Sequence, residues 1–340
     1  MRSSLASIAL VFGLIFAMSQ VGVSFSPDPS NVLNVLPSTG LQVGFYNGRC
    51  PNKYVDIQTF IEEEVEKQFR YDPTLLPAFL RLQFHDCFVN GCDASITIEG
   101  STTERTAPAN AGVRDFDFID RLKVKVEEIC PDTVSCADII AIATTTVFKL
   151  AGGQDYQVHT GRRDGLRSVK EDVKLPSPSM SVSWSFEFFQ AKGFTLEEMV
   201  TLLGCHTVGI AHCALFQNRL YYGNTEYDPL MDNSLRQKLL YTCPQYQNST
   251  NVAFLDQSVD YTFKDEYDNY YFQQILKQRG VLPIDQAIAR DPSTVGTVVK
   301  FANSLSTFNA KLAEALLKLQ AVDVLTGYNG NIRKVCSKFN

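Results

Sequence analysis

Apolar residues recur at helical spacing along most of this 340-residue chain, and this pattern limits the possible folds more than any other feature. In YVDIQTFIEEEVEKQF, residues 54–69, four apolar side chains are spaced four apart, as on the buried face of an amphipathic helix: Ile57, Ile61, Val65 and Phe69. Three further segments have similar patterns: RDFDFIDRLKVKVEEI (114–129), CADIIAIATTTVFKL (136–150) and FNAKLAEALLKLQ (308–320). Clusters of Gly and Pro separate these segments. We therefore predict an all-α fold of many moderate helices, with at most a short β-hairpin in residues 156–165.

The first residues have the organisation of a secretory signal peptide, which we place at residues 1–26. Arg2 supplies the basic start, and the apolar run that follows is short for a membrane anchor, the alternative interpretation. Residues 27–40 contain three prolines and no periodicity, so they are expected to form a flexible leader before a folded domain at 41–340. The mature protein is then expected to be secreted, with no membrane segment.

Charge and cysteine content narrow the class of protein. The 31 basic and 37 acidic residues give a net charge of −6, which does not indicate a nucleic-acid binder. In an oxidising compartment the nine cysteines can form four disulfides and leave one thiol over. Four bridges permit about a hundred connectivities, so counting does not choose among them. The Asn248 sequon, in a polar run, predicts a glycosylated loop.

Two histidines lie in patterns that indicate chemistry. Thr195 and Glu198 form a capping-box signature, and the apolar stripe of the helix that follows places His206 on the core side at the helix end. Arg81 and His85 are four apart on another helix, so they project together and suit proton transfer with stabilisation of negative charge. The alternatives are a hydrogen-bonded core histidine and a surface pair, respectively.

The segment DCFVNGCDAS, which follows directly, offers oxygen ligands of the kind that Ca²⁺ prefers. Asp86, Asp93 and Ser95 supply side-chain oxygens, and Gly91 lets the backbone turn so that its own carbonyl and that of Val89 can point inward. The spacing is not that of an EF-hand. A zinc site made by the histidine and the two cysteines of this region, His85, Cys87 and Cys92, is the alternative.

The sequence resembles the secretory plant peroxidases, the class III haem peroxidase family. The similar motifs run in family order from about Gln42 to the C-terminus: LLPAFLRLQFHDCFVNGCDAS, CPDTVSCADII, LAGG followed by TGRRDG, LPSP, GCHTVGIAHC, RGVLPIDQ and LTGYNGNIRKVC. The resemblance implies a fold of two helical halves that sandwich haem b.

The resemblance also implies a role for each matching residue. His206 would ligate the haem iron and Asp285 would accept its Nδ1 hydrogen, which strengthens the imidazole as a donor. On the other face His85 would be the acid–base catalyst, Arg81 the charge stabiliser and Asn110 the residue that orients His85. The carbonyl of Pro176 would orient aromatic donors.

Calcium ligands and disulfides are implied in the same way. The distal calcium ligands would be Asp86, Val89, Gly91, Asp93 and Ser95, with Glu104 supporting this region. The proximal set would include Thr207, Asp260 and Asp268. The implied disulfides are Cys50–Cys130, Cys87–Cys92, Cys136–Cys336 and Cys213–Cys243.

Two features depart from the family pattern. Cys205 replaces the usual glycine before the proximal histidine; on one continuous helix it would lie about 12 Å along the axis from Cys213, too far for a disulfide. We expect it to be the unpaired ninth cysteine and an inert core thiol, with an oxidation-prone thiol as the alternative. In LDQSVDYTFKDEYD both Asp256 and Asp260 lack the usual hydroxyl residue three positions later, so we expect weak or altered proximal calcium binding.

These features together predict a haem-dependent peroxidase that reduces H₂O₂ and oxidises phenolic donors by one-electron steps. We expect a monomeric glycoprotein of the cell wall or apoplast, acting in the response to oxidative stress. The alternative is a catalytically weak haem- and Ca²⁺-binding wall protein. A secreted zinc hydrolase is less favoured, because no H-E-x-x-H motif is present.

Overall fold

The computed structural model describes residues 40–224, 226–245, 250–258 and 267–340. The predicted signal peptide, nearly all of the leader, the Asn248 sequon and Asp260 therefore lie outside the described residues. The described α-helices are α1 (Ile57–Tyr71), α2 (Leu75–Cys87), α3 (Phe116–Ile129), α4 (Cys136–Leu150), α5 (Val182–Ala191), α6 (Leu196–Leu203), α7 (Asn233–Thr242), α8 (Tyr270–Leu276), α9 (Pro283–Ile288), α10 (Val295–Ala302) and α11 (Leu305–Leu319). Short 3₁₀ helices join many of them. The predicted all-α class is confirmed.

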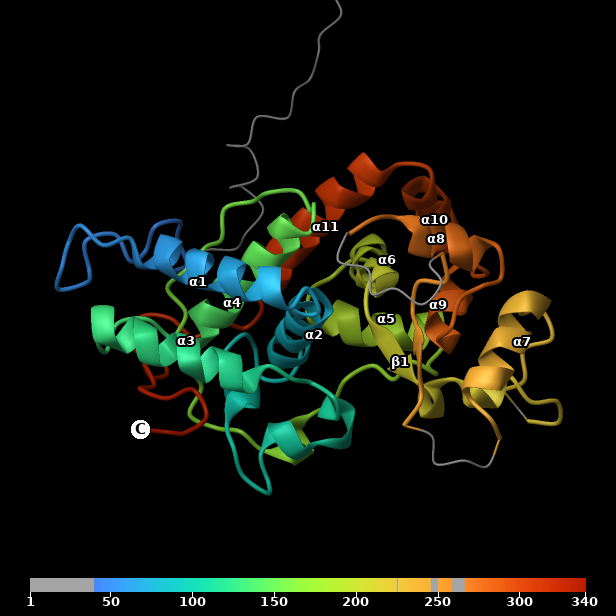
Figure 1. Ribbon diagram of the computed structural model, residues 1–340, viewed down its shortest axis with the longest axis horizontal. Helices are drawn as coiled ribbons and strands as arrows, with labels where there is room; N and C mark the ends of the chain where they lie inside the picture. Colours follow the sequence, from blue (N-terminus) through green and yellow to red (C-terminus); the bar gives the residue numbers. More distant parts are fainter. Residues whose placement is uncertain (1–39, 225, 246–249, 259–266) are drawn as a thin grey trace, which may run out of the picture. The chain divides into compact units, whose positions relative to one another are not determined.

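Helix α4 is the centre of the N-terminal helix group. Its first residue follows Ser135, whose hydroxyl accepts a hydrogen bond from the Asp138 amide at 3.1 Å and so caps the helix. Every residue from Cys136 to Phe148 is buried, because α1, α2 and α3 all pack against this helix (Figure 1). In α1 the buried residues are the four that the sequence pattern predicts: Ile57, Ile61, Val65 and Phe69.

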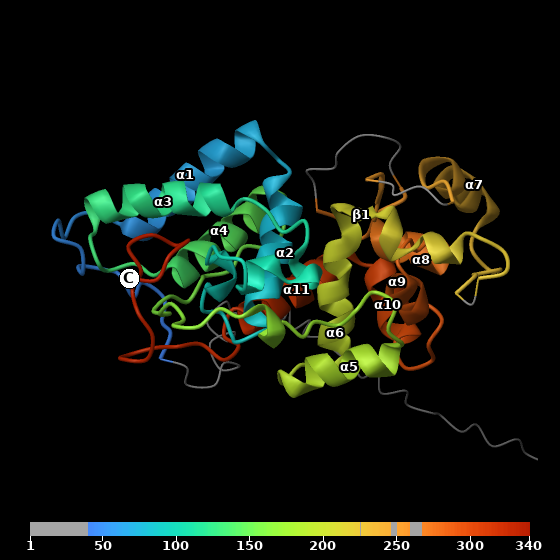
Figure 2. The ribbon, with the colours of Figure 1, turned by 90° about the horizontal axis from the view of Figure 1, so that it is seen from below.

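The second helix group is built around α6. Helix α6 packs against α5, α10 and α11, and α8 packs against α9, α10 and the 3₁₀ turn η6 (Gly204–Thr207) that continues α6. Figure 2 shows the yellow-to-orange helices of this group together, beside the blue-to-green helices α1–α4. The sequence prediction for α6 is confirmed, since Thr195 and Glu198 form both hydrogen bonds of a capping box.

The β-structure lies elsewhere than predicted. The described sheet pairs β1 (Ile210–His212) with β2 (Val252–Phe254) in antiparallel register. The hairpin expected in residues 156–165 is wrong: that segment instead makes isolated bridges from Thr160, Arg163 and Asp164 to remote partners. The cause is long-range, because the neighbouring Arg162 is fully buried and ion-paired with Asp138 of α4.

Four disulfides connect the chain, and their partners are those that the resemblance implies: Cys50–Cys130, Cys87–Cys92, Cys136–Cys336 and Cys213–Cys243. Cys205 is free, as expected. The helical argument for this was wrong, because α6 ends at Leu203 and the chain passes through η6 into β1 before Cys213.

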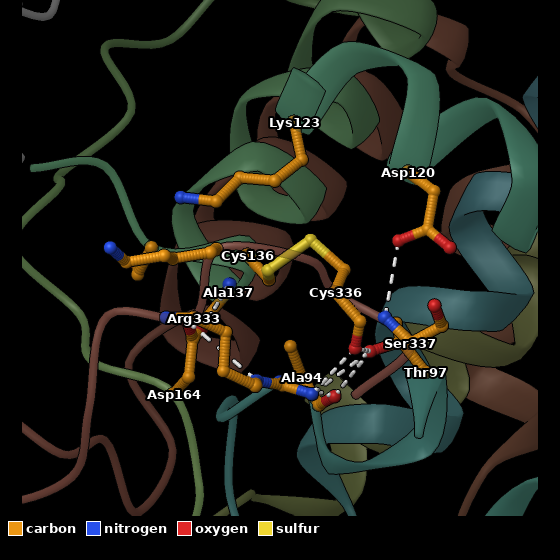
Figure 3. Close-up of a disulfide and its surroundings, with 12 residues drawn as sticks. Ala94, Thr97, Asp120, Lys123, Cys136, Ala137, Asp164, Arg333, Cys336 and Ser337 are labelled. Carbon is orange, nitrogen blue, oxygen red and sulfur yellow. Dashed lines mark hydrogen bonds and ion pairs between the residues drawn. A yellow bond between two sulfur atoms is a disulfide. The ribbon is translucent and has the colours of Figure 1, made fainter. Parts of the chain in front are cut away.

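The Cys136–Cys336 disulfide attaches the C-terminal segment to α4 (Figure 3). Beside it, the fully buried Arg333 donates hydrogen bonds of 2.7 Å to the carbonyls of Ala94 and Cys336. Ala94 belongs to the loop that carries the predicted calcium ligands, so the C-terminal segment supports that loop. Among the described residues, no helix is long and apolar enough to cross a bilayer.

Candidate active site

Helix α2 positions the first histidine of the site. His85 lies one turn after Arg81 on this helix, and its Nδ1 is 2.7 Å from the Oδ1 of Asn110. The Nδ2 of Asn110 donates to the backbone carbonyl of Glu104 at 2.7 Å, so the amide oxygen is the atom that faces the imidazole. Since an amide oxygen only accepts, His85 carries its proton on Nδ1 and keeps Nε2 free as a base.

The pKa of His85 is suited to accepting a proton. Burial, followed by the positive charge of Arg81, lowers this pKa from its ordinary value to about 4, while the Asn110 hydrogen bond opposes the shift. His85 is therefore neutral near neutral pH. A neutral imidazole beside a permanently charged guanidinium can take a proton and leave the negative charge to Arg81.

Arg81 and His85 hold the same short segment. The Nη2 of Arg81 donates to the carbonyls of Ala109 and Ala111, at 3.3 and 3.0 Å, on both sides of the residue that His85 contacts. These bonds fix the 3₁₀ turn η4 (Pro108–Asn110) against α2. Gly112, next along the chain, lies between Arg81 and His212: a Cβ there would be 3.4 Å from Nη1 and 3.9 Å from the His212 Nε2.

The second histidine of the site follows the capped helix α6. His206 lies in η6, and its Nδ1 is 2.8 Å from the Oδ1 of Asp285, a fully buried residue of α9. Burial opposes protonation of His206, but the negative charge and hydrogen bond of Asp285 prevail and raise its pKa. As with His85, an oxygen acceptor occupies Nδ1 and leaves Nε2 free to bind another group.

The two histidines lie near the same guanidinium. The charge of Arg81 contributes to the lowered pKa of His85 and opposes the rise in the pKa of His206, so the guanidinium lies within electrostatic reach of each imidazole. The backbone after His206 also contacts α2, since a Cβ on Gly209 would lie 3.1 Å from Pro77. The site thus combines two imidazoles and one guanidinium, drawn from both helix groups.

A cluster of buried carboxyl groups adjoins this site at the end of α2. Asp86 accepts a hydrogen bond from the Ala94 amide, while the Ser95 hydroxyl donates to Glu104 at 3.0 Å and the Ser95 amide donates to Asp93. Burial raises the pKa values of all three acids, and repulsion from Asp93 adds to the rise at Asp86 and at Glu104, whose pKa reaches about 7. The Oδ1 of Asp86 is buried and has no hydrogen-bond partner in the described part of the chain.

Glycine is required in the loop that joins these acids. Gly91 has φ of +104°, and a Cβ there would lie 2.3 Å from the backbone carbonyl oxygen of Asp323.

The carbonyl of Val89, a predicted calcium ligand, accepts a hydrogen bond from Lys192 at 3.1 Å, and Lys192 also pairs with Asp323. Sequence reasoning missed Lys192, because nothing in its local pattern links it to this loop.

The remaining calcium candidates are partly brought together. Thr207 donates to Asp268 at 2.8 Å, which joins two of the predicted proximal ligands. Ser258 donates to Asp256 at 2.8 Å, a hydroxyl two positions on rather than three. Within the described ranges, no group of three or more His, Cys, Asp or Glu side chains is arranged to hold a metal ion. The predicted distal set has a different make-up, with two aspartates, one hydroxyl and two carbonyls.

Pro176 and Cys205 are the two other residues that the sequence analysis singled out. Pro176 is half-buried in an irregular segment, and Pro178 in the same segment accepts a hydrogen bond from Ile284, the residue before Asp285. Cys205 is partly buried, and burial raises the pKa of its thiol to about 12. Because the thiolate is the reactive form, this favours the prediction of an inert thiol.

The sequence matches a known class of protein. The family model for peroxidases matches residues 61–304, most of the chain, so the chain belongs to the peroxidase family. It is a haem peroxidase of the plant type.

Its relatives are plant enzymes similar over nearly their whole length. The chain is 46% identical over 302 residues to Peroxidase 57 of Arabidopsis thaliana, and the match covers 88% of this chain and 93% of the relative. Peroxidase 44 of Arabidopsis thaliana is 44% identical over 304 residues, with 88% and 93% covered. Peroxidase N1 of Nicotiana tabacum is 38% identical over 308 residues, with 88% and 91% covered.

Proposed function

We propose that His206 would hold the haem iron through Nε2, that Asp285 would orient this imidazole, and that His85, Arg81 and Asn110 would carry out the acid–base chemistry on the peroxide. One observation carries this proposal: each histidine has its Nδ1 against an oxygen acceptor, at 2.7 Å from Asn110 and 2.8 Å from Asp285. The two acceptors differ in charge. A carboxylate strengthens His206 as a metal ligand, whereas a neutral amide leaves His85 a weak base that can take and return a proton.

The residues of the chain would then act in a fixed order. Bound haem supplies the redox centre at which the O–O bond of H₂O₂ is broken. His85 would take a proton from one oxygen of the peroxide and return it to the other, departing oxygen, which leaves as water. Arg81 stabilises the negative charge that develops on the departing oxygen. Asn110 keeps the proton of the imidazole on Nδ1 throughout.

We further propose that Ca²⁺ binds at the Asp86 to Ser95 loop. The set of donors fits this cation, because Asp86 has a buried oxygen without a partner in the described residues and the adjoining acids repel one another. Val89 and Gly91 would contribute carbonyls, and Glu104 would support Ser95 from behind. A second, weaker site would include Thr207, Asp268 and Asp256 or Asp260.

Phenolic compounds are the proposed electron donors, oriented by the Pro176 carbonyl, and the proposed setting is the extracellular wall, where the protein acts as a monomer. The hydrogen bond from Ile284 to Pro178 supports the first point, because it ties the Pro176 segment to the helix that carries Asp285. The four disulfides support secretion, since such bonds persist in oxidising compartments.

The test is an absorption spectrum of the purified, haem-loaded protein before and after one equivalent of H₂O₂, followed by guaiacol. We expect a ferric Soret band that shifts rapidly with peroxide and returns with guaiacol. A Soret band that does not respond would favour the alternative, a weakly active haem- and Ca²⁺-binding wall protein. A His206→Ala variant that binds and reacts like the wild type would contradict the proposed role of His206.

A further inference from the structure

A buried tyrosine shares the carboxylate oxygen that holds His206. The hydroxyl of Tyr271, in α8, donates to the Oδ1 of Asp285 at 2.9 Å. The same oxygen is the partner of the His206 Nδ1 at 2.8 Å. The other oxygen of this carboxylate, Oδ2, is buried without a hydrogen-bond partner among the described residues. Both donors therefore compete for one acceptor atom.

The direction of the tyrosine hydrogen bond is fixed by chemistry and burial. An ionised carboxylate only accepts, so the Tyr271 hydroxyl must donate. Burial and the neighbouring charge of Asp285 raise the pKa of Tyr271 well above its ordinary value, which keeps the proton on the hydroxyl. Its ring packs edge-on against the His206 imidazole, with centroids 6.1 Å apart and an interplanar angle of 85°. The donor is therefore permanent and fixed in place.

A second hydrogen bond weakens a carboxylate as a base, because part of its negative charge is already neutralised. We propose that Tyr271 is a positioning residue that limits how strongly Asp285 draws on the Nδ1 proton of His206, and so limits electron donation from His206 to the haem iron. This inference rests on the proposed function, in which His206 binds that iron. It assigns Tyr271 no contact with peroxide or with the electron donor.

The chain offers a matched control for this hydroxyl. Tyr267, four residues before Tyr271, is another buried tyrosine. It is only 5% exposed, and its ring packs against Phe148 and Phe308. Its hydroxyl is buried and has no hydrogen-bond partner in the part of the chain that the structure describes. Tyr267→Phe thus removes a buried hydroxyl without removing a bond to Asp285.

The experiment compares the iron–imidazole stretching frequency of the ferrous, haem-loaded proteins by resonance Raman spectroscopy, together with their midpoint potentials. For Tyr271→Phe we expect a higher frequency and a lower midpoint potential than the wild type, because Asp285 then acts on His206 alone. Tyr267→Phe should leave both unchanged. Incorporation of 3-fluorotyrosine at position 271 retains the fold and makes the hydroxyl a stronger donor, so the frequency should fall.

The outcomes separate this inference from the proposed function. Asp285→Asn should lower the frequency in any protein that binds iron through His206. A wild type without an iron–imidazole band, or one whose band ignores Asp285→Asn, would overturn the proposed function. A band that responds to Asp285→Asn but is the same in the wild type, Tyr271→Phe and the fluorotyrosine protein would overturn the role of Tyr271 alone.

Discussion

Asn110 connects His85, the proposed acid–base residue, to the acidic loop, the segment from Asp86 to Ser95 that Glu104 supports. Its amide oxygen faces His85, and its amide nitrogen donates to the carbonyl of Glu104, whose side chain accepts from Ser95 and Asn90. These hydrogen bonds connect α2, the turn at Asn110, Glu104 and the turn at Ser95 in series. The position of the His85 imidazole therefore depends on a loop whose buried acids repel one another.

Replacement of Asn110 by alanine tests this dependence. Asn110→Ala removes the acceptor that keeps the His85 proton on Nδ1, so the imidazole can rotate and present the wrong nitrogen. We expect the second-order rate of the reaction with H₂O₂ to fall about 10-fold to 100-fold, part of the 10²- to 10⁴-fold that a general acid–base contributes. Stopped-flow absorbance measures this rate. Asn303→Ala, at an exposed asparagine, is the control and should react like the wild type.

The pH dependence of the same rate follows from His85. Burial and Arg81 hold its pKa at about 4, below the ordinary value, and only the neutral form can accept a proton from peroxide. The rate should therefore be constant above about pH 5 and fall as the pH drops through 4. In Asn110→Ala the midpoint should move lower still, because Asn110 raises this pKa. A rate that halves near pH 6.5 would contradict the lowered pKa of His85, and a rate that stays constant through pH 4 and below would show that His85 is not the base.

Among the secondary-structure elements, the sequence predicts the helices whose signals come from residues close together in the sequence. The apolar period of α1 and the capping box of α6 are local signals, and each corresponds to a helix in the structure. The hairpin expected at 156–165 failed because its segment pairs with Gln42 and with residues near the C-terminus and is held by an ion pair to α4. Tyr271 was missed for the same reason, since its bond to Asp285 spans two helices.

The capping box begins α6, the helix that leads into the turn carrying His206. Thr195 accepts from the Glu198 amide, and Glu198 accepts from the Thr195 amide and from Lys318 of α11. Thr195→Ala removes the cap, and we expect it to lower the free energy of unfolding by about 1 kcal/mol. Urea denaturation followed by circular dichroism measures the loss. Thr195→Ser keeps the hydroxyl, and an equal loss in that variant would count against the capping explanation.

For the whole molecule, the acidic loop is held from three directions. Asp86 lies in the last turn of α2, and the C-terminal segment contributes Arg333. Lys192 follows α5 and pairs with Asp323 after α11. These supports come from segments far apart in the sequence. The loop is therefore a place where binding of a cation would stabilise the folded chain as a whole rather than one helix.

Removal of calcium tests this coupling. Asp86, Asp93 and Glu104 are buried and repel one another, so a bound divalent cation stabilises the folded state over the unfolded one. We expect a chelator to lower the melting temperature and added Ca²⁺ to restore it, by calorimetry at pH 7. Mg²⁺ should restore less, because it demands a tighter octahedral set of ligands. Asp93→Asn removes one negative charge from the set, so its melting temperature should respond less to Ca²⁺ than that of the wild type. An equal response in Asp93→Asn and in the wild type would place the stabilising calcium outside this loop.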